Sequence, residues 1–237
     1  MNPAKPLGRK AYGSIPHLPD SRLGPGDHHC SPGQADIATL RARDRHDVVI
    51  VQEKLDGSNV AVAKVGGLLL PLTRAGYHAN TSPYAQHHRF AAWVHARWQQ
   101  FDALLGEGER VCGEWLAQAH GTRYNLGFRL PFVAFDIMRD QERASFSECS
   151  ARCEAVDLPL PPLLSMGEPL SVERALSILG EGGFYGAIDA VEGAVWRVER
   201  GGKIDFLVKY VRPEKKDGAY LESITGEPPI WNWDARL

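Results

Sequence analysis

Residues 48–65 read VVIVQEKLDGSNVAVAKV, and this stretch decides the fold. Two apolar runs rich in β-branched residues flank the segment 55–58, and such residues favour extended strands. Asp56-Gly57 lies between the runs, and this dipeptide is typical of tight turns. The stretch therefore predicts a hairpin or a tight strand-to-strand turn, with Lys54 at the end of the first strand.

The rest of the chain alternates between strands and single helices. Apolar residues recur three and four apart between His87 and Leu105, which predicts one helix there. Two shorter helices, each begun by a Ser that can cap it, are predicted over 146–156 and 172–179. Further strands are predicted over 68–72, 110–117, 131–138, 191–199 and 204–211. Helices that occur singly between hairpins indicate an α+β fold with mainly antiparallel sheets.

The composition narrows the class of protein. The 237 residues include 27 basic and 29 acidic side chains and carry a formal charge of −2, so any phosphate-binding region must be a local patch. No apolar stretch reaches the roughly 18 residues of a membrane helix. The basic N-terminus is not followed by the apolar segment of a secretory signal. We therefore expect a cytoplasmic protein whose four cysteines are free.

Residues 1–45 are rich in Pro, Gly, His and Asp and show little periodicity. We expect an irregular segment that packs on a core formed by residues 46–237. Two roles are open for this segment. Its basic residues and His17 could contact phosphates, or it could be a structural wrap that packs Ile15 and Leu18 on the core. The basic residues concerned are Arg9, Lys10 and Arg22.

Six short motifs follow one another along the chain. The first, EKLDGSN at 53–59, says little alone, because most lysines at strand ends are solvated. Its meaning changes with the segments that follow in order, namely TRAG at 73–76, GEWL at 113–116, FVAFDI at 132–137, EGAV at 192–195 and FLVKYVRP at 206–213. No GxGxxG or GxxxxGK[ST] follows a strand, which excludes a dinucleotide fold or a phosphate loop.

This ordered set resembles the covalent nucleotidyltransferase superfamily of polynucleotide ligases and mRNA capping enzymes. Within it, the chain is similar to ATP-dependent RNA ligases, in particular small bacterial RNA ligases that lack a C-terminal domain. The resemblance covers 48–213, and the Ser-Asn after KLDG, the FDI ending and KYVRP favour RNA ligases over DNA ligases. It implies a nucleotidyltransferase (adenylyltransferase) catalytic domain over 46–237, of the ATP-grasp-like ligase type. Too few residues follow Lys209 for the oligonucleotide-binding barrel of DNA ligases, so no C-terminal OB barrel is expected.

The resemblance also implies a site. Lys54 would attack the α-phosphate of ATP and become a lysyl-adenylate, Glu53 would accept a hydrogen bond from the adenine amino group, and Phe135 would stack on the base. It further assigns Glu114 to a ribose hydroxyl, Glu192 to a divalent Mg2+ or Mn2+, and Arg74 and Lys209 to phosphate or ribose oxygens with a part in catalysis. Asp56, Gly57 and Asn59 belong to the nucleotide-binding set, and Asn59 would also act in the later steps on RNA.

The physics of the nucleophile agrees with such a site. An unperturbed Lys has a pKa of about 10.4, so near neutral pH only about one in a thousand is the free amine, which costs roughly 4 kcal/mol. Desolvation, the cations Arg74 and Lys209 and a bound metal can each lower that pKa. Each site residue could alone be an ordinary surface or core residue. Two acids, an aromatic and two cations in family order around Lys54 are not explained in that way.

One departure concerns the last motif, where many members of the family carry KxK. Here the first of those positions is Leu207, which leaves Lys209 as the matching lysine. Arg212, Lys215 or Lys216 could supply the missing charge, or none is needed.

The resulting function is an RNA ligase of RNA repair that joins 5'-phosphate and 3'-hydroxyl RNA ends through a lysyl-AMP and an RNA-adenylate, with a monomer expected and no membrane partner. The alternatives are a DNA ligase or guanylyltransferase on the same core, or a non-catalytic RNA-binding relative. The presence of Lys54 argues against the last of these.

Overall fold

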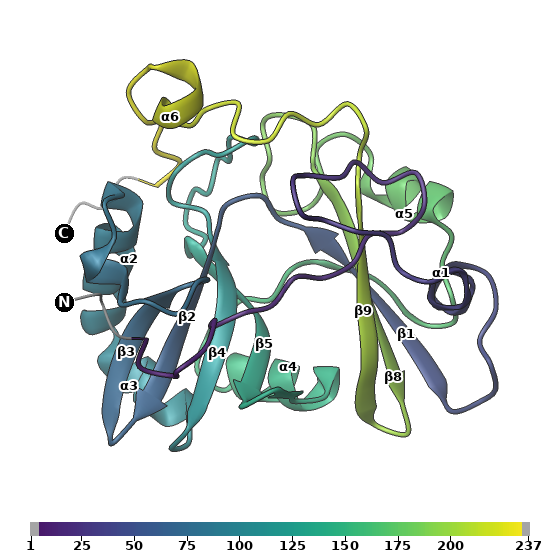
Figure 1. Ribbon diagram of the computed structural model, residues 1–237, viewed down its shortest axis with the longest axis horizontal. Coiled ribbons are helices and arrows are strands. Elements are labelled where there is room, and N and C mark those ends of the chain that lie inside the picture. The colour runs from purple at the N-terminus through teal and green to yellow at the C-terminus, as the bar shows by residue number, and fades with distance from the viewer. Residues whose placement is uncertain (1–4, 234–237) are drawn as a thin grey trace. The chain divides into compact units, whose positions relative to one another are not determined.

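The computed structural model describes residues 5–233, which form two compact units with one antiparallel sheet each (Figure 1). Unit 1 comprises 5–13, Ser58–Gln118 and Leu130–Leu160, and unit 2 comprises Ser14–Gly57, Ala119–Arg129 and 161–233. The chain therefore passes from unit 2 to unit 1 directly after Gly57. The α+β class and the antiparallel sheets are as predicted.

Unit 1 is built on a five-stranded sheet in the order β3-β2-β4-β5-β6. Its strands are β2 (Ser58–Val65), β3 (Leu68–Thr73), β4 (Glu109–Trp115), β5 (Phe132–Arg139) and β6 (Glu142–Arg143), and its helices are η1 (Ala79–Thr81), α2 (Ala85–His95), α3 (Trp98–Leu104) and α4 (Phe146–Glu154). Phe90 and Trp93 of α2 pack against Trp115 and Phe132 with ring centroids 5.3 to 5.9 Å apart. This aromatic cluster fills the space between α2 and one face of the sheet.

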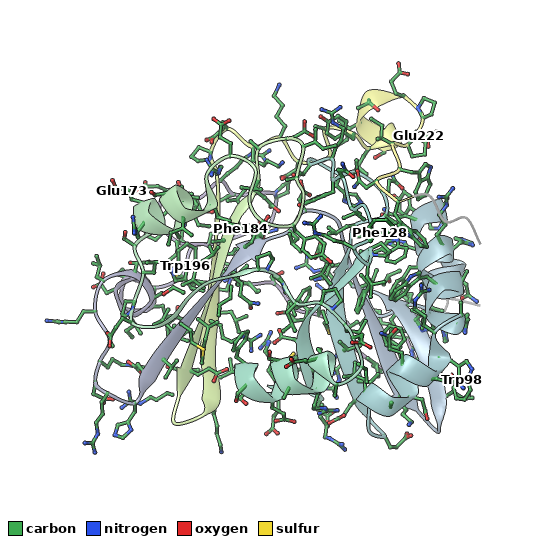
Figure 2. All side chains as sticks on the ribbon, turned by 180° about the vertical axis from the view of Figure 1, so that it is seen from behind. Trp98, Phe128, Glu173, Phe184, Trp196 and Glu222 are labelled. Atoms are coloured by element: carbon green, nitrogen blue, oxygen red, sulfur yellow. The ribbon has the colours of Figure 1, made fainter. Side chains whose placement is uncertain are left out.

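Unit 2 is built on a four-stranded sheet in the order β7-β1-β8-β9. Its strands are β1 (Asp47–Lys54), β7 (Leu163–Gly167), β8 (Gly193–Arg200) and β9 (Lys203–Val211), and its helices are α1 (Pro32–Thr39), α5 (Val172–Leu179) and α6 (Glu222–Thr225). Its core contains Leu18, Val49, Val208 and Trp196, which is labelled in Figure 2. The buried Trp196 donates from Nε1 to the Leu170 carbonyl oxygen at 2.8 Å, so its polar atom is satisfied.

The range from His87 to Leu105, predicted as one helix, is two helices. Arg97, with φ −122° and ψ 27°, leaves the helical conformation and separates α2 from α3. Its guanidinium lies 4.6 Å from the centroid of the Trp93 ring, while Trp98 is half exposed. The apolar periodicity predicted the covered face and missed the break, because Trp98 does not belong to that face.

The segment 1–45, predicted as irregular, contains the helix α1. Ser31 caps it, Pro32 occupies its first turn, and the Gln34 side chain accepts from the Ser31 backbone N–H. These are known helix-start residues, so the sequence did carry the signal. The prediction also missed β6, β7, η1 and α6, all of which are short. The division of the chain at residue 45 stays a prediction.

All four cysteines are free, as predicted. Among residues 5–233, no helix combines the length and the apolar character needed to cross a membrane.

Candidate active site

Strand β1 ends at the predicted nucleophile. Lys54 lies opposite Gly193 of β8, and its Nζ forms an ion pair with Oε2 of Glu192 at 2.5 Å. A Cβ at Gly193 would lie 2.0 Å from the carbonyl oxygen of Tyr210 on β9, so only glycine fits there. Burial raises the pKa of Glu192, and the facing Lys54 ammonium offsets part of that rise. The structure therefore brings the predicted nucleophile and the predicted metal ligand into direct contact.

The turn after Lys54 is held by Asp56. Its Oδ2 accepts hydrogen bonds from the Gly121 N–H at 3.1 Å and from the Thr122 hydroxyl at 3.0 Å. The Asp56 backbone N–H donates to the Tyr124 hydroxyl at 3.0 Å. Asp56 thus fixes the backbone of the nucleophile turn, and Gly57, the next residue, ends the unit 2 segment that begins at Ser14.

Lys215 is not available to a phosphate. Its side chain is buried, and its ammonium donates to the carbonyl oxygens of Gly121 at 2.8 Å and Ala190 at 3.0 Å and to the Thr122 hydroxyl. It also lies 3.5 Å from Oδ2 of Asp56. The suggestion that Lys215 replaces the lysine missing at position 207 is therefore wrong, because three acceptors already use its three N–H groups.

Glu53 is a buried acid with an unused acceptor. Only 1% of the residue is exposed, and its Oε2 accepts from the backbone N–H of Phe184 at 2.8 Å. Its Oε1 has no hydrogen-bond partner among residues 5–233, and burial raises the pKa of the carboxyl. Figure 2 labels Phe184, whose side chain is half exposed. An unpaired buried acceptor costs about 1–3 kcal/mol, so Glu53 is suited to a ligand that donates a hydrogen bond.

Lys209 occupies the edge strand of the same sheet. It lies opposite Val195 of β8, and its Nζ is 3.8 Å from Oδ1 of Asp27. Arg212, just after β9, donates to the Gly180 carbonyl oxygen at 2.5 Å. In unit 2 the sheet thus carries Lys54 on β1 and Lys209 on β9, with Glu192 directly before β8.

Unit 1 carries the other predicted site residues. Asn59 of β2 pairs directly with Glu114 of β4, and Asn59 accepts at its carbonyl oxygen from the Arg74 backbone N–H at 3.1 Å. Ser58 and Trp115, one residue along each strand, point the other way, because side chains alternate in a strand. Trp115 belongs to the aromatic cluster, so Asn59 and Glu114 share the opposite face.

Phe135 sits where the pairing of β4 and β5 shifts by one residue, between Ala134 and Asp136. The Tyr12 ring packs edge-on against it with centroids 5.0 Å apart. The Tyr12 hydroxyl donates to Oδ2 of the fully buried Asp136 at 2.6 Å, and Arg143 Nε donates to the same oxygen at 3.1 Å. Tyr12 and Asp136 therefore fix Phe135. Sequence reasoning missed Tyr12, which belongs to no periodic pattern, although Asp136 stands inside the FVAFDI motif.

The N-terminal residues also hold Arg74. The Arg74 carbonyl oxygen accepts from the Ala11 N–H at 3.0 Å, and its guanidinium donates to the Gly13 carbonyl oxygen at 3.2 Å. Arg9, proposed as a phosphate contact, forms an ion pair with Asp140 at 3.2 Å. Residues 9–13, which belong to unit 1, are thus tied to the rest of it by backbone contacts as well as by charge.

The site offers few side chains that could bind a metal. Within residues 5–233, no three His, Cys, Asp or Glu side chains come together as a metal site. Glu192 offers one carboxylate, and Mg2+ in nucleotide sites is commonly held by one or two carboxylates together with substrate phosphates. The donor set therefore fits a metal that arrives with a nucleoside triphosphate.

The sequence model of the RNA ligase family matches residues 47–211. The chain belongs to the RNA ligase family. The matched range extends from β1 to β9, so it contains every predicted site residue of this RNA ligase family member, and it leaves out the segment before residue 47. The resemblance stated from the motifs is confirmed at the level of the family.

Solved structures share this fold. A variant of the Naegleria gruberi RNA ligase in its apo form is 16% identical, with a TM-score of 0.54, and the match covers 92% of this chain and 60% of that one. Another variant, solved with ATP and Mn, is 16% identical, with a TM-score of 0.53 over 75% of this chain and 53% of that one. An archaeal ATP-dependent RNA ligase is 20% identical over 70% and 42%, with a TM-score of 0.48.

The chain thus spans less than two thirds of the length of these structural relatives. The comparison with curated proteins finds no match. The roles given above to single residues, including Arg74, Glu114, Phe135 and Lys209, stay predictions.

Proposed function

We propose that the protein is an ATP-dependent RNA ligase that joins 5'-phosphate and 3'-hydroxyl RNA ends through a lysyl-AMP and an RNA-adenylate. The observation that carries this proposal is the ion pair between Lys54 and Glu192 at the end of β1, inside the range matched by the RNA ligase family. A lysine at the end of a strand, paired with a buried acid, supports the assignment of Lys54 as the nucleophile.

The chemistry asks three things of Lys54. Its amine must lose a proton, form a bond to the α-phosphorus of ATP and displace pyrophosphate. The contact with Glu192 at 2.5 Å stabilises the charged ammonium, so that contact has to weaken before the attack. A divalent metal, when bound, neutralises charge on the triphosphate. Glu192, whose carboxylate pairs with Lys54, would hold such a metal.

Glu53 supports adenine as the base. The unused Oε1 acceptor fits the exocyclic amino group of adenine, which donates hydrogen bonds. Guanine carries a carbonyl oxygen at the same ring position and would face the carboxylate with another acceptor. Glu53 therefore favours ATP over GTP, and with it a ligase over a guanylyltransferase.

The test is covalent labelling. The protein is incubated with α-labelled ATP or GTP and Mg2+ or Mn2+, then separated by denaturing electrophoresis. We expect an acid-labile label from ATP in the native chain and none in Lys54→Ala. Lys64→Ala is the matched control, because Lys64 is as exposed as Lys54, 19% against 21%, and also pairs with a carboxylate, that of Asp102. It should label like the native chain.

Two results contradict the proposal. A label that persists in Lys54→Ala refutes the nucleophile, and stronger labelling by GTP replaces the ligase with a guanylyltransferase.

The RNA partner belongs to the same proposal. We expect sealing of RNA that carries a 5'-phosphate and a 3'-hydroxyl, and none when the 5' end is a hydroxyl. Sealing of nicked DNA in preference to RNA would contradict it. The monomeric state, to be checked by sedimentation, and the cytoplasmic location stay predictions.

A further inference from the structure

Residues 16–29 form a loop along the edge of β9 (Figure 1). The Lys209 N–H donates to the Pro16 carbonyl oxygen at 3.0 Å, and the Leu18 N–H donates to the Lys209 carbonyl oxygen at 2.8 Å. Two residues further on, Val211 donates to the Ser21 hydroxyl oxygen at 2.9 Å. The loop is therefore bound to β9 at Lys209 itself and at the next residue on the same face.

His17 lies inside this loop and is 1% exposed, so the suggestion that it contacts a phosphate is wrong. Its Nδ1 is 2.7 Å from the Ser21 hydroxyl oxygen, and its Nε2 is 3.0 Å from Oδ2 of Asp27. A carboxylate can only accept, so Asp27 favours the neutral ring tautomer that carries its proton on Nε2, and Nδ1 then accepts from the Ser21 hydroxyl. The Nε2 proton is thus near Oδ2 of Asp27, although the two groups are not aligned as a hydrogen bond. Burial, with the nearby Lys209, lowers the pKa of His17 and keeps the ring neutral.

Asp27 contacts both His17 and Lys209. Its Oδ2 accepts from the Gly24 N–H at 3.2 Å and faces His17, while its Oδ1 lies 3.8 Å from the Lys209 ammonium. Burial alone would raise the pKa of Asp27, but Lys209, the Gly24 N–H and His17 together lower it, so the side chain is a carboxylate. The path starts at the backbone of Val211 and ends at the side chain of Lys209, two residues apart on β9.

We propose that Asp27 is a positioning residue for Lys209, held in place by His17 and Ser21. The inference rests on the proposed function, which gives Lys209 its task at the nucleotide. A lysine has a flexible four-carbon stem, so a fixed carboxylate beside its ammonium restricts where the charge lies. Leu207, on the same face of β9, is buried and apolar at the position where many members of the family have a second lysine. By holding Lys209, Asp27 provides the site with one fixed cation, whereas those proteins have two lysines.

The segment that carries Asp27 lies before residue 47, outside the range matched by the family. The N-terminal segment therefore contributes to the site through a carboxylate that orders a lysine. The charged side chains that act on the His17 ring are those of Asp27, Lys209 and, further away, Lys54.

The test is a double-mutant cycle on Lys54 adenylylation. Asp27→Asn keeps an oxygen toward Gly24 and His17 and turns an amide NH2 toward Lys209, so only the attraction to the ammonium is lost. We expect the second-order rate constant for adenylylation to fall about tenfold, the middle of the range for coupled neighbours. In a Lys209→Met background the same change should have less than a twofold effect. Asp20→Asn, a change in an exposed carboxylate of the same loop, should leave the rate unchanged.

Three results overturn the inference. These are a native rate for Asp27→Asn, an equal loss in the Lys209→Met background, which would indicate a merely structural role, and an equal loss for Asp20→Asn. If Lys209→Met reacts too slowly to time, the cycle is run on ATP dissociation constants in the Lys54→Ala protein, with the same expected coupling. If Asp27→Asn unfolds, Ser21→Ala replaces it, because it removes the hydroxyl that orients His17.

The proposed function is tested separately in these experiments. If the native chain and Lys54→Ala both fail to label with ATP, the ligase proposal fails whatever Asp27 does. If the native chain labels and Asp27→Asn matches it, only the role of Asp27 is refuted.

Discussion

Replacing Gly183 by Ala should damage both the stability of the protein and its use of ATP. Gly183 has φ +55°, and a Cβ there would lie 2.3 Å from Oε1 of Glu53 and 2.7 Å from a methyl group of Val191. Gly201, in the turn between β8 and β9, has φ +57°, and a Cβ there would meet nothing within 4 Å. The two glycines therefore share a backbone conformation, but only at Gly183 would a Cβ clash with neighbouring side chains.

The free energies of unfolding follow from that difference. A left-handed residue with a Cβ costs about 1–2 kcal/mol, and the smaller entropy of the unfolded chain returns part of it, so Gly201→Ala should lose about 1 kcal/mol. Overpacking adds about 1–3 kcal/mol at Gly183. For a chain of this size each kcal/mol lowers Tm by about 2–4 °C, so Gly183→Ala should melt about 2–12 °C below Gly201→Ala.

The assay pairs thermal unfolding with the KM for ATP in adenylylation. Because Gly183→Ala pushes on the Glu53 carboxylate, its KM for ATP should rise about tenfold, which corresponds to roughly 1.4 kcal/mol of lost binding. Gly201→Ala should keep the native KM. Equal Tm and equal KM in the two variants would refute the close approach of Gly183 to Glu53 and the role given to Glu53.

Three further results are expected. Glu192→Gln should suppress adenylylation, whereas Asn59→Ala should label normally and seal RNA poorly, and equal loss in both assays for Asn59→Ala would place it in the nucleotide pocket. Hydrogen bonds from Arg123 lower the pKa of Asp189 to about 2. The contribution of this ion pair to the free energy of unfolding is therefore present above pH 4 and is lost as the pH falls through 2. Asp189→Asn should cost about 1 kcal/mol at pH 7, reduced by the partial exposure of the pair, and a deficit that stays constant in denaturant titrations from pH 5 to 2 would contradict this. Burial raises the pKa of Cys112 to about 12, so a thiol reagent should modify the part-exposed Cys30 first, and faster labelling of Cys112 in the native protein would show that its site opens.

Sequence motifs predicted the part of the site that depends on local pattern. Glu53 and Lys54 stand at the end of β1, and Glu192 stands directly before Gly193, the first residue of β8, so all three lie in one sheet or directly next to it. The motifs did not predict which strands pair. The hairpin that the sequence allowed over 48–65 is wrong, because β1 pairs with β7 and β8 whereas β2 pairs with β3 and β4 in the other sheet, so the turn at 55–57 connects two strands that do not pair. The motifs also carried little information on the surroundings of individual side chains. Lys215 is an example, because a basic residue near a chain end is usually solvated and no local pattern predicts the three acceptors that bury it.

The contributions of the N-terminal segment could not be predicted in this way. Tyr12, His17 and Asp27 lie in stretches without hydrophobic periodicity, and their partners are more than 100 residues away or across a loop. Such contacts depend on how the loop docks on β9 and on the face of β5, which no spacing within 1–45 encodes. The helix α1 is different, because its capping box was readable.

The docking of residues 16–22 on β9 also protects the protein against aggregation through its sheet edge. An edge strand offers unpaired N–H and C=O groups to any other strand that approaches, and proteins protect such edges to avoid aggregation. Here Pro16, Leu18, Ser21 and Arg22 occupy the groups of Lys209 and Val211. A chain shortened past residue 22 would therefore expose the unpaired N–H and C=O groups of β9 and would be prone to aggregate. A loss of activity in such a variant could be given a catalytic meaning only after light scattering had shown that the variant is not aggregated.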